Sequence, residues 1–144
     1  MLRILLVCTG NTCRSPMAET LLREKIRQSG KQDSIKTLSA GIAAFGEYPA
    51  SDGALEIMRE KGLDLDKHRS CQLVPDLINT ADIILTMTEG HKTNLLRMAP
   101  SAKAKTYTLA EFAGETGDVD DPVGQPIQVY RDCAQQMESL IDKA

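Results

Sequence analysis

The sequence predicts an α/β fold: one domain in which a parallel sheet is covered by helices on both faces. Short apolar runs alternate with longer segments of helical periodicity, which is the pattern of repeated strand–helix units. The chain has 144 residues, which suits a single domain, and no internal repeat, low-complexity tract or linker divides it. We therefore treat residues 1–144 as one domain and expect its site at the carboxyl ends of the strands.

Four segments are expected to form strands. The first, residues 2–7, is almost continuously apolar, as is typical of a strand that is buried on both faces. The run at residues 81–87 (ADIILTM) is the clearest of the later strands. Two weaker segments complete the predicted sheet, residues 35–39 and a short strand over residues 68–73.

Helices are expected between and after these strands. Apolar residues at helical spacing predict a helix over Ser51–Lys61, and Gly62 ends it. The other expected helical segments are residues 16–29, a helical turn at residues 75–79, residues 89–98 and residues 127–142.

The composition excludes several classes of partner. Seventeen Lys and Arg against twenty Asp and Glu give a net charge of −3, so neither nucleic acid nor an anionic membrane is expected as a partner. No apolar run approaches the roughly 20 residues that span a bilayer. The first run is too short for a signal peptide, so we expect a cytoplasmic protein. The four cysteines, at positions 8, 13, 71 and 133, are then expected to be free thiols.

The segment Cys8–Ser15 (CTGNTCRS) joins the first strand to the first helix. Backbone N–H groups and the helix dipole converge at such a turn, and Gly10 lets the backbone approach an anion closely. A Cys8 thiol there is expected to have a lowered pKa and to act as a nucleophile. The planar guanidinium of Arg14 suits a phosphate group. A packed, inert cysteine is the alternative, but the combined features favour phosphoryl chemistry.

Two roles remain open for Ser15. Its hydroxyl is a good cap for a helix that has Pro16 at its first position. It could equally donate a hydrogen bond to the Cys8 sulfur and ease its departure as a thiolate. One hydroxyl rarely does both, so the sequence does not choose between these roles.

A displacement through cysteine also needs a proton donor opposite the nucleophile. The acidic segment 117–124 (GDVDDPVG) offers three aspartates, Asp118, Asp120 and Asp121. Segments of this type are usually solvated loops. Asp121 precedes a proline, which restricts its backbone, but the residue types alone leave all three carboxylates as candidates.

Several motifs occur in a fixed order along the chain: CTGNTCRSP at residues 8–16, then Ser39-Ala40-Gly41, His68-Arg69-Ser70, Ala81-Asp82 and Asp121-Pro122. Together they resemble the low-molecular-weight protein tyrosine phosphatase family over nearly the whole chain. The resemblance implies an enzyme that acts on phosphorylated proteins without a metal or organic cofactor. We expect the flavodoxin-like strand order 2-1-3-4 and a monomer.

The resemblance also implies a role for each site residue. Cys8 attacks phosphorus and forms a phosphocysteine, while Asp121 protonates the leaving group and then activates the hydrolytic water. The phosphoryl oxygens are held by Arg14 and by the substrate-binding loop residues Thr9, Gly10, Asn11, Thr12, Cys13 and Ser15. The supporting residues that brace the loop by hydrogen bonds are Asn11, Ser39 and His68.

The cysteine pair in the loop suggests redox control. Cys13 follows Cys8 by five residues, close enough to trap an oxidised Cys8 as a disulfide before irreversible overoxidation. Related phosphatases with this pair are reversibly inactivated in that way. We expect Cys71 and Cys133, which lack partners at matching spacing, to be structural.

Thr12 suggests which phosphoryl group is removed. Tyrosine phosphatases of the family usually carry an aliphatic residue at this position and aromatic residues after the Asp-Pro, whereas this chain has Thr12, Val123 and Gly124. A slot without aromatic walls gains little from a phenol ring, while Thr12 and Asp121 could accept hydrogen bonds from a guanidinium group. The bacterial protein arginine phosphatases, with threonine in this place, resemble the chain closely. We therefore expect a protein arginine phosphatase; the alternative is a phosphotyrosine phosphatase in which Thr12 is a tolerated variant.

Two functions outside phosphatase chemistry are disfavoured. A module that only binds phosphate has no use for the Cys8 nucleophile. A carrier that passes phosphate on from cysteine does not need Asp121, which would hasten hydrolysis. Turnover of a phosphocysteine form, rather than its accumulation, separates these classes.

Overall fold

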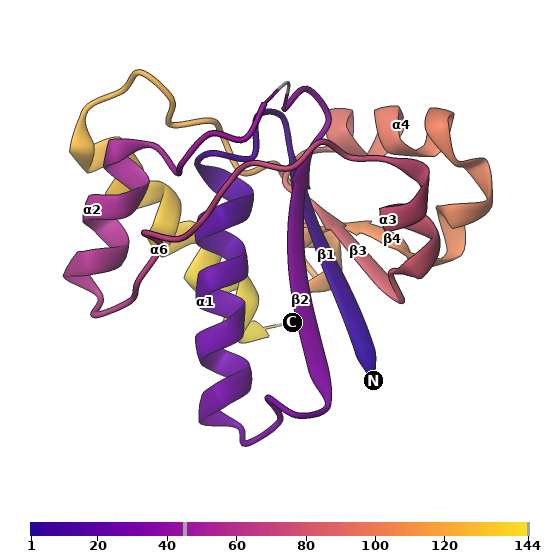
Figure 1. The fold of residues 1–144 in the computed structure, drawn as a ribbon, viewed down its shortest axis with the longest axis horizontal. Coiled ribbons are helices and arrows are strands. Elements are labelled where there is room, and N and C mark those ends of the chain that lie inside the picture. Colours follow the sequence, from indigo (N-terminus) through magenta and orange to yellow (C-terminus); the bar gives the residue numbers. More distant parts are fainter. Residues whose placement is uncertain (45, 144) are drawn as a thin grey trace.

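A parallel sheet with helices on both faces forms the body of the molecule (Figure 1). The computed structural model describes residues 1–44 and 46–143. Within these residues the sheet has four strands in the order β2-β1-β3-β4. They are β1 (Leu2–Cys8), β2 (Ile35–Gly41), β3 (Ile83–Thr86) and β4 (Thr106–Thr108). The predicted α/β class and strand order are confirmed.

The helices lie in two layers. One face of the sheet packs against α1, α5 and α6, with α2 lying outside α1 and α6, and the other face packs against α3, α4 and the 3₁₀ helix η1. Their bounds are α1 (Arg14–Gln28), α2 (Asp52–Glu60), α3 (Pro75–Thr80), α4 (Glu89–Met98), η1 (Pro100–Lys105), α5 (Leu109–Phe112) and α6 (Ile127–Lys143).

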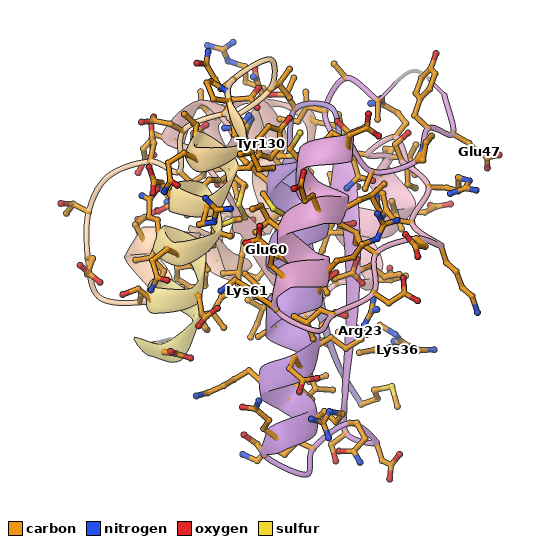
Figure 2. All side chains as sticks on the ribbon, turned by 90° about the vertical axis from the view of Figure 1, so that its left-hand side faces the viewer. Arg23, Lys36, Glu47, Glu60, Lys61 and Tyr130 are labelled. Atoms are coloured by element: carbon orange, nitrogen blue, oxygen red, sulfur yellow. The ribbon has the colours of Figure 1, made fainter. Side chains whose placement is uncertain are left out.

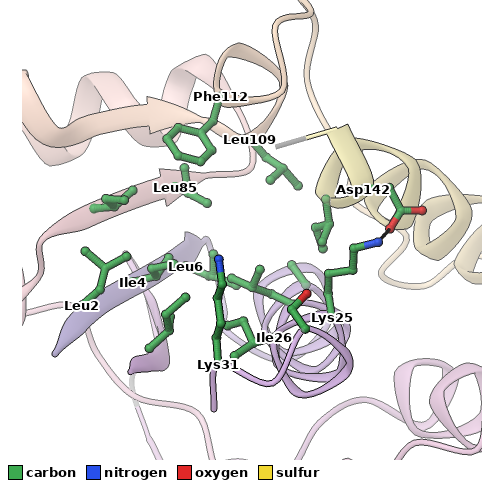
Figure 3. A pocket seen from close by; sticks show the side chains of 16 residues that line it. Leu2, Ile4, Leu6, Lys25, Ile26, Lys31, Leu85, Leu109, Phe112 and Asp142 are labelled. Carbon is green, nitrogen blue, oxygen red and sulfur yellow. Dashed lines mark ion pairs between the residues drawn. The ribbon is translucent and has the colours of Figure 1, made fainter. Parts of the chain in front are cut away.

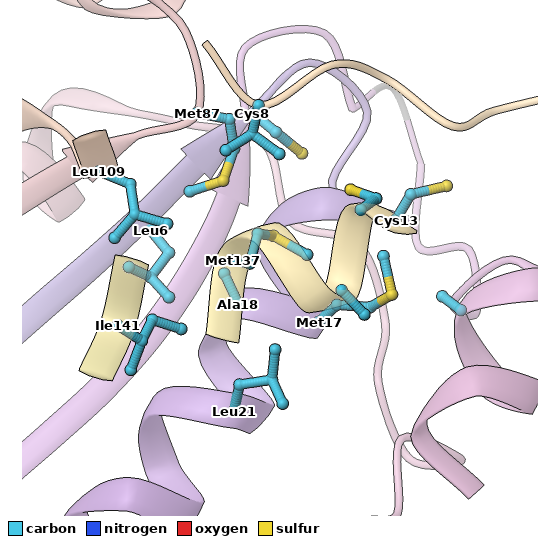
Figure 4. Packing of buried hydrophobic residues seen from close by; sticks show 14 of the residues in the cluster. Leu6, Cys8, Cys13, Met17, Ala18, Leu21, Met87, Leu109, Met137 and Ile141 are labelled. Carbon is cyan, nitrogen blue, oxygen red and sulfur yellow. The ribbon is translucent and has the colours of Figure 1, made fainter. Parts of the chain in front are cut away.

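The central strand β1 divides the core because its successive side chains point to opposite faces. Leu6 and Cys8 pack with Met17 of α1 and Met137 of α6 (Figure 4). Val7 packs into the separate cluster on the α3 and α4 side. Cys8 is therefore the last residue of a strand that is covered on both faces, and its side chain lies on the α1 and α6 side.

One predicted strand is wrong, and one observed strand was not predicted. In residues 68–73 the described sheet contact is a single bridge between Gly41 and Gln72. Ser70 turns away from the sheet, because its N–H donates to the Tyr48 carbonyl oxygen at 2.7 Å. The fourth place in the sheet belongs to β4, whose three residues are too few to show any periodicity.

The observed helix ends lie within two residues of the predicted ones for α1, α2, α3, α4 and α6. Ser51 caps α2 by accepting an N–H hydrogen bond of 3.4 Å from the first turn. Gly62 follows α2 with a φ of 74°, a left-handed backbone that suits glycine. The first helix begins earlier than predicted, at Arg14, and its cap residue Cys13 makes no side-chain cap.

Helices α2 and α6 are joined on the surface and in the interior. Glu60 and Lys61 lie beside α6 (Figure 2), and each forms an ion pair of 2.8 Å with one of its residues. Exposed pairs of this type contribute only about 0–1 kcal/mol each. The closer contact is at Gly53, where a Cβ would lie 2.6 Å from the Tyr130 ring. The lack of a side chain at Gly53 thus allows Tyr130 to sit against α2.

An apolar cavity of about 290 Å³ lies between α1, α6 and the sheet (Figure 3). Leu2, Ile4 and Phe112 contribute to its lining, and an ion pair of 3.2 Å between Lys25 and Asp142 lies at its side. The strand residues in this lining are Leu2, Ile4 and Leu6 of β1, Ile35 of β2, and Ile83 and Leu85 of β3, and none of them is the last residue of its strand. The cavity is therefore separate from the carboxyl edge, where the sequence predicts the site.

At the carboxyl edge, Cys8 of β1 pairs with Gly41 of β2. A Cβ on Gly41 would lie 2.5 Å from the Thr9 carbonyl oxygen and 2.9 Å from the Asn11 backbone nitrogen. Backbone atoms cannot rotate out of such a contact, so only glycine lets the loop after β1 fold over the end of β2. The chain crosses to opposite sides of β1 to form β2 and β3, so this edge is also a topological switch point, where such folds bind ligands.

Gly41→Ala is expected to lower the free energy of unfolding by about 1–3 kcal/mol, the usual cost of overpacking. Urea denaturation measures this change. Gly90→Ala is the matched control, because a Cβ there meets the Thr88 hydroxyl at an ordinary 3.5 Å and lies within α4. The control is expected to be neutral or to stabilise by up to about 1 kcal/mol. If Gly41→Ala were as stable as the wild type, the close approach of the Thr9–Asn11 backbone to Gly41 would be contradicted.

Candidate active site

The loop between β1 and α1 is held by hydrogen bonds that converge on Asn11, a fully buried residue. Its φ of 57° is left-handed, which is uncommon outside glycine. The side-chain amide donates to the Ser15 hydroxyl at 2.8 Å, and its carbonyl oxygen accepts from the Cys71 N–H at 2.9 Å. His68 Nε2 donates to the Asn11 backbone carbonyl at 2.7 Å. Segments that are far apart in the sequence thus fix the loop in one shape.

Cys8 lies at the bottom of this loop, and its sulfur is 2.9 Å from the Ser15 hydroxyl oxygen. The Asn11 amide already occupies one lone pair of that hydroxyl, which leaves its hydrogen free to donate to the sulfur. The Asn11 backbone N–H also donates to the sulfur, at 3.3 Å. Of the two roles that the sequence leaves open for Ser15, the structure shows the hydrogen bond to Cys8 and no cap on α1.

The pKa of the Cys8 thiol is raised, whereas the sequence predicts a lowered pKa. Burial raises the pKa of the Cys8 thiol above its ordinary value, because removal of water disfavours the thiolate. The hydrogen bonds from Ser15 and the Asn11 N–H, and the charge of Arg14, all act to lower this pKa. The prediction of a lowered pKa counted these donors but not the near-complete loss of water, which outweighs them.

Arg14 joins the loop to the acidic segment. Its guanidinium is buried, and Nη1 donates to the Val119 carbonyl oxygen at 2.9 Å. Nη2 lies 3.4 Å from the Thr9 hydroxyl and 3.6 Å from a carboxylate oxygen of Asp121. One side chain therefore orients the anion loop and keeps the candidate acid beside it.

The three candidate aspartates have separate surroundings. Asp121 is half exposed at the mouth of the loop, and its other carboxylate oxygen accepts from the Val123 N–H at 3.0 Å. Asp118 accepts from the Glu89 N–H at 2.9 Å, at the start of α4. Asp120 is exposed and lines no part of the cavity over the loop. Of the three carboxylates, only Asp121 lines the cavity that Cys8 also lines.

A cavity of about 260 Å³ lies over the loop. Its lining residues are Cys8, Thr9, Gly10, Thr12, Cys13, Arg14, Asp121 and Val123. None of these residues is aromatic. Asn11 and Ser15 are buried beneath the loop and act on its shape and on the Cys8 sulfur rather than on the cavity wall.

Several loop N–H groups are available to an anion. Those of Gly10, Thr12 and Cys13 donate to no described backbone carbonyl, and that of Arg14 lies in the first turn of α1, where helix N–H groups lack partners. These residues line the same cavity as Cys8, together with the guanidinium of Arg14. Such a cradle suits a phosphoryl group, whose three oxygens all accept hydrogen bonds.

Cys13 lies at the edge of the same cavity with three hydroxyl groups around its sulfur. The nearest is the Ser51 hydroxyl at 3.1 Å, followed by the Tyr130 hydroxyl at 3.6 Å and the Thr12 hydroxyl at 3.8 Å. All four cysteines are free thiols in the structure. Cys8 and Cys13 thus both reach the loop cavity, whereas Cys71 is exposed and Cys133 is buried elsewhere.

The structure departs from the sequence analysis at two further positions. Ser39 lies in β2 opposite Leu6, and its hydroxyl forms no hydrogen bond with any described residue, so it is not among the braces seen here. His91 was not predicted, although its Nε2 lies 2.8 Å from the Thr9 hydroxyl. A lone histidine in the first turn of a helix carries no sequence pattern that would have revealed this contact.

Residues 1–44 and 46–143 contain no group of three or more His, Cys, Asp or Glu side chains that could hold a metal ion. No described helix is both long and apolar enough to cross a membrane.

Comparison with known proteins agrees with this geometry. The family model described as low molecular weight phosphotyrosine protein phosphatase matches residues 3–144. The chain belongs to this family. It is 45% identical to a protein-arginine-phosphatase of Geobacillus stearothermophilus over 98% of this chain and 92% of the relative.

Solved structures of this phosphatase family have the same fold. A low molecular weight protein tyrosine phosphatase from T. tengcongensis superimposes with a TM-score of 0.94 at 41% identity, covering 99% of this chain and 97% of the other. A YwlE arginine phosphatase variant with a phosphorylated active-site serine has a TM-score of 0.94 at 36% identity, covering 99% and 92% of the two chains. The family thus includes relatives named for each of the two substrates considered from the sequence.

Ser15→Ala is expected to raise the pKa of Cys8 further, because it removes a hydrogen bond that stabilises the thiolate. Alkylation of Cys8 by iodoacetamide should therefore shift to higher pH and become several-fold slower near neutrality. Mass spectrometry of the peptide that contains Cys8 follows the reaction separately from the exposed Cys71. Ser29→Ala, at the far end of α1, is the control. An unchanged pH profile in Ser15→Ala would contradict the role of this hydroxyl.

Proposed function

We propose that this phosphatase hydrolyses phosphoarginine in proteins through a phosphocysteine intermediate. The observation that carries the proposal is the cavity over the loop, where Cys8, Arg14 and Asp121 meet beside a polar Thr12 and no aromatic residue contributes to the lining. The first three groups supply nucleophile, anion clamp and acid. The polar Thr12 and the lack of an aromatic residue in the lining favour a planar, hydrogen-bonding guanidinium over a phenol ring.

In the first step, Cys8 reacts as the thiolate, whose proton has passed to solvent and whose charge is stabilised by the donors from Ser15 and Asn11 and by Arg14. The sulfur attacks phosphorus while the loop N–H groups and Arg14 hold the phosphoryl oxygens. The bond between phosphorus and the guanidino nitrogen breaks, and Asp121 gives that nitrogen a proton. In the second step, the Asp121 carboxylate takes a proton from water, which attacks phosphorus and breaks the S–P bond. The Ser15 hydroxyl, 2.9 Å from the sulfur, stabilises the departing thiolate.

Two sets of observations support the substrate assignment. Thr12 and Asp121 both line the cavity, so a guanidinium leaving group would find oxygen acceptors on either side. The relative from Geobacillus stearothermophilus is named for arginine phosphatase activity and is 45% identical to this chain. The second candidate, a phosphotyrosine phosphatase, is favoured by the equally close fold of the T. tengcongensis protein.

The remaining parts of the proposal concern the cellular setting. Phosphorylated proteins are the substrates of the family, and the net charge of −3 gives no attraction to nucleic acid or anionic lipid. We infer a cytoplasmic protein that acts as a monomer.

Thr12→Ile is expected to shift the preference from phosphoarginine toward phosphotyrosine. Isoleucine removes the hydroxyl acceptor and adds apolar surface that a phenol ring can contact. The measurement is kcat/KM for phosphate release from arginine-phosphorylated and tyrosine-phosphorylated proteins, with an expected change of at least about tenfold in the ratio.

Thr12→Ser is the matched control, because it keeps the hydroxyl and loses only a methyl group. It should retain the preference of the wild type. Faster turnover of phosphotyrosine than of phosphoarginine by the wild type would contradict the arginine assignment and favour the second candidate.

Asp121→Asn is expected to lower kcat by roughly 10²–10⁴-fold, the usual contribution of a general acid and base. Slow hydrolysis should also let the phosphocysteine accumulate, which intact-mass spectrometry after acid quenching detects. Asp120→Asn is the control, because this neighbouring carboxylate is exposed and lies outside the cavity lining. An equal loss in both variants would show that the acid has been assigned wrongly.

We also propose that Cys8 and Cys13 form a protective disulfide. Peroxide oxidises the Cys8 thiolate to a sulfenic acid, and the Cys13 thiol displaces water from it. A thiol reductant then restores both cysteines. Wild-type enzyme should recover activity after peroxide and dithiothreitol, whereas Cys13→Ala should lose it irreversibly. Full recovery of activity in Cys13→Ala would be incompatible with the disulfide. Cys71→Ala, which removes a thiol outside the loop, is the control variant.

A further inference from the structure

His91, in α4, contacts the phosphate-binding loop at Thr9. It lies in the first turn of α4, where the Thr88 hydroxyl accepts its backbone N–H at 3.1 Å. The residue is only 7% exposed, and its Nε2 is 2.8 Å from the Thr9 hydroxyl oxygen. Its other ring nitrogen, Nδ1, is buried and has no hydrogen-bond partner among the described residues. Thr9 itself lines the cavity, whereas His91 does not.

The imidazole of His91 is neutral at physiological pH. Burial, together with the positive charge of Arg14, lowers the pKa of His91 to about 4, and the charges of Asp118 and Asp121 oppose this only in part. A neutral imidazole carries one ring proton, on either Nε2 or Nδ1, and the two forms orient the Thr9 hydroxyl in opposite ways.

The surroundings favour the proton on Nε2. If Nδ1 carried it, a buried N–H would be left without an acceptor, and orphaned buried N–H groups are rarer than under-satisfied acceptors. The Thr9 hydroxyl would also have to donate to Nε2, so that it would present only a lone pair to the cavity. With the proton on Nε2, the ring donates to Thr9, and the unpartnered Nδ1 is merely an acceptor.

This arrangement leaves the Thr9 hydrogen facing the cavity. The hydroxyl oxygen has two lone pairs, one of which accepts from His91 and the other from the Arg14 guanidinium at 3.4 Å. With both lone pairs occupied, the O–H has no acceptor within the described protein and is available to an oxygen bound in the loop.

We propose that Thr9 donates its hydroxyl hydrogen to a phosphoryl oxygen of the substrate and that His91 is the positioning residue that turns the hydroxyl toward it. The inference rests on the proposed phosphatase function but not on the identity of the leaving group. It adds a side-chain donor to the backbone cradle and extends the site to the start of α4.

Kinetics of variants at the two positions test this linkage. Thr9→Val, which is isosteric but has no hydroxyl, should lower kcat about tenfold to a hundredfold, as expected for a lost hydrogen bond to a charged group. Thr9→Ser should retain most of the activity. His91→Leu should lower kcat less than Thr9→Val, and His91→Gln, whose side-chain amide can donate from a similar position, should restore it. Para-nitrophenyl phosphate is the substrate, and urea denaturation controls for folding.

The double variant Thr9→Val/His91→Leu distinguishes positioning from a merely structural role. If His91 acts through the Thr9 hydroxyl, the double variant should be no slower than Thr9→Val alone. Multiplied losses in the double variant, or failure of His91→Gln to restore kcat while its stability is normal, would overturn the proposal.

Long-range ¹H–¹⁵N NMR on the wild type tests the protonation state without any substitution. The chain has two histidines, and the set of signals that disappears in His91→Gln belongs to His91. A protonated Nε2 and an unprotonated Nδ1 are expected at neutral pH. The opposite tautomer would overturn the proposal.

Affinity for inorganic phosphate separates this inference from the proposed function. Thr9→Val and His91→Leu should both weaken phosphate binding, measured by calorimetry on the complete chain. If both substitutions weaken phosphate binding but the wild type does not hydrolyse phosphoarginine, the substrate assignment fails and the role of His91 stands. Wild-type phosphate affinity in both variants would overturn the inference even if phosphoarginine is hydrolysed.

Discussion

The left-handed backbone at Asn11 is the constraint on which the rest of the site depends. It directs the Asn11 carbonyl to His68 while the side chain bridges Ser15 and the Cys71 N–H. An uncommon backbone conformation of this kind persists only where the surroundings over-determine it. The close approach that Gly41 permits on the neighbouring strand is part of the same arrangement. The cradle is therefore formed before any substrate arrives, which avoids the cost of ordering donors during the reaction.

Burial of Cys8 has two consequences that oppose each other. Loss of water disfavours the thiolate, so the pKa of Cys8 is raised despite the surrounding donors. The same exclusion of water strengthens every electrostatic interaction inside the cavity. The hydroxyl of Ser15 and the charge of Arg14 act at the sulfur in this setting, and they remain in place when the sulfur becomes a leaving group in the second step.

Arg14 links the anion loop to the acidic segment. Its contact with the Val119 carbonyl fixes the segment that carries Asp121, while its other nitrogen reaches Thr9 in the loop. The proposed nucleophile, Cys8, and the proposed acid, Asp121, are more than a hundred residues apart in the sequence, and the buried guanidinium of Arg14 contacts the segments that carry them. The contact between Thr9 and His91 extends this arrangement to α4, so that the cradle is supported from both faces of the sheet.

The sequence by itself determined the chemistry and most of the fold, because the Cys8–Ser15 loop is a local motif and the main strands and helices have clear periodicity. It also suggested the substrate through Thr12. Tertiary structure decided the rest. Residues 68–73 brace the loop and do not form a strand of the sheet. The Ser15 hydroxyl forms a hydrogen bond with the Cys8 sulfur and does not cap α1. Burial raises the pKa of Cys8, whereas the sequence predicted a lowered pKa. These outcomes depend on contacts between distant segments and on the exclusion of water, and neither property is encoded in local spacing.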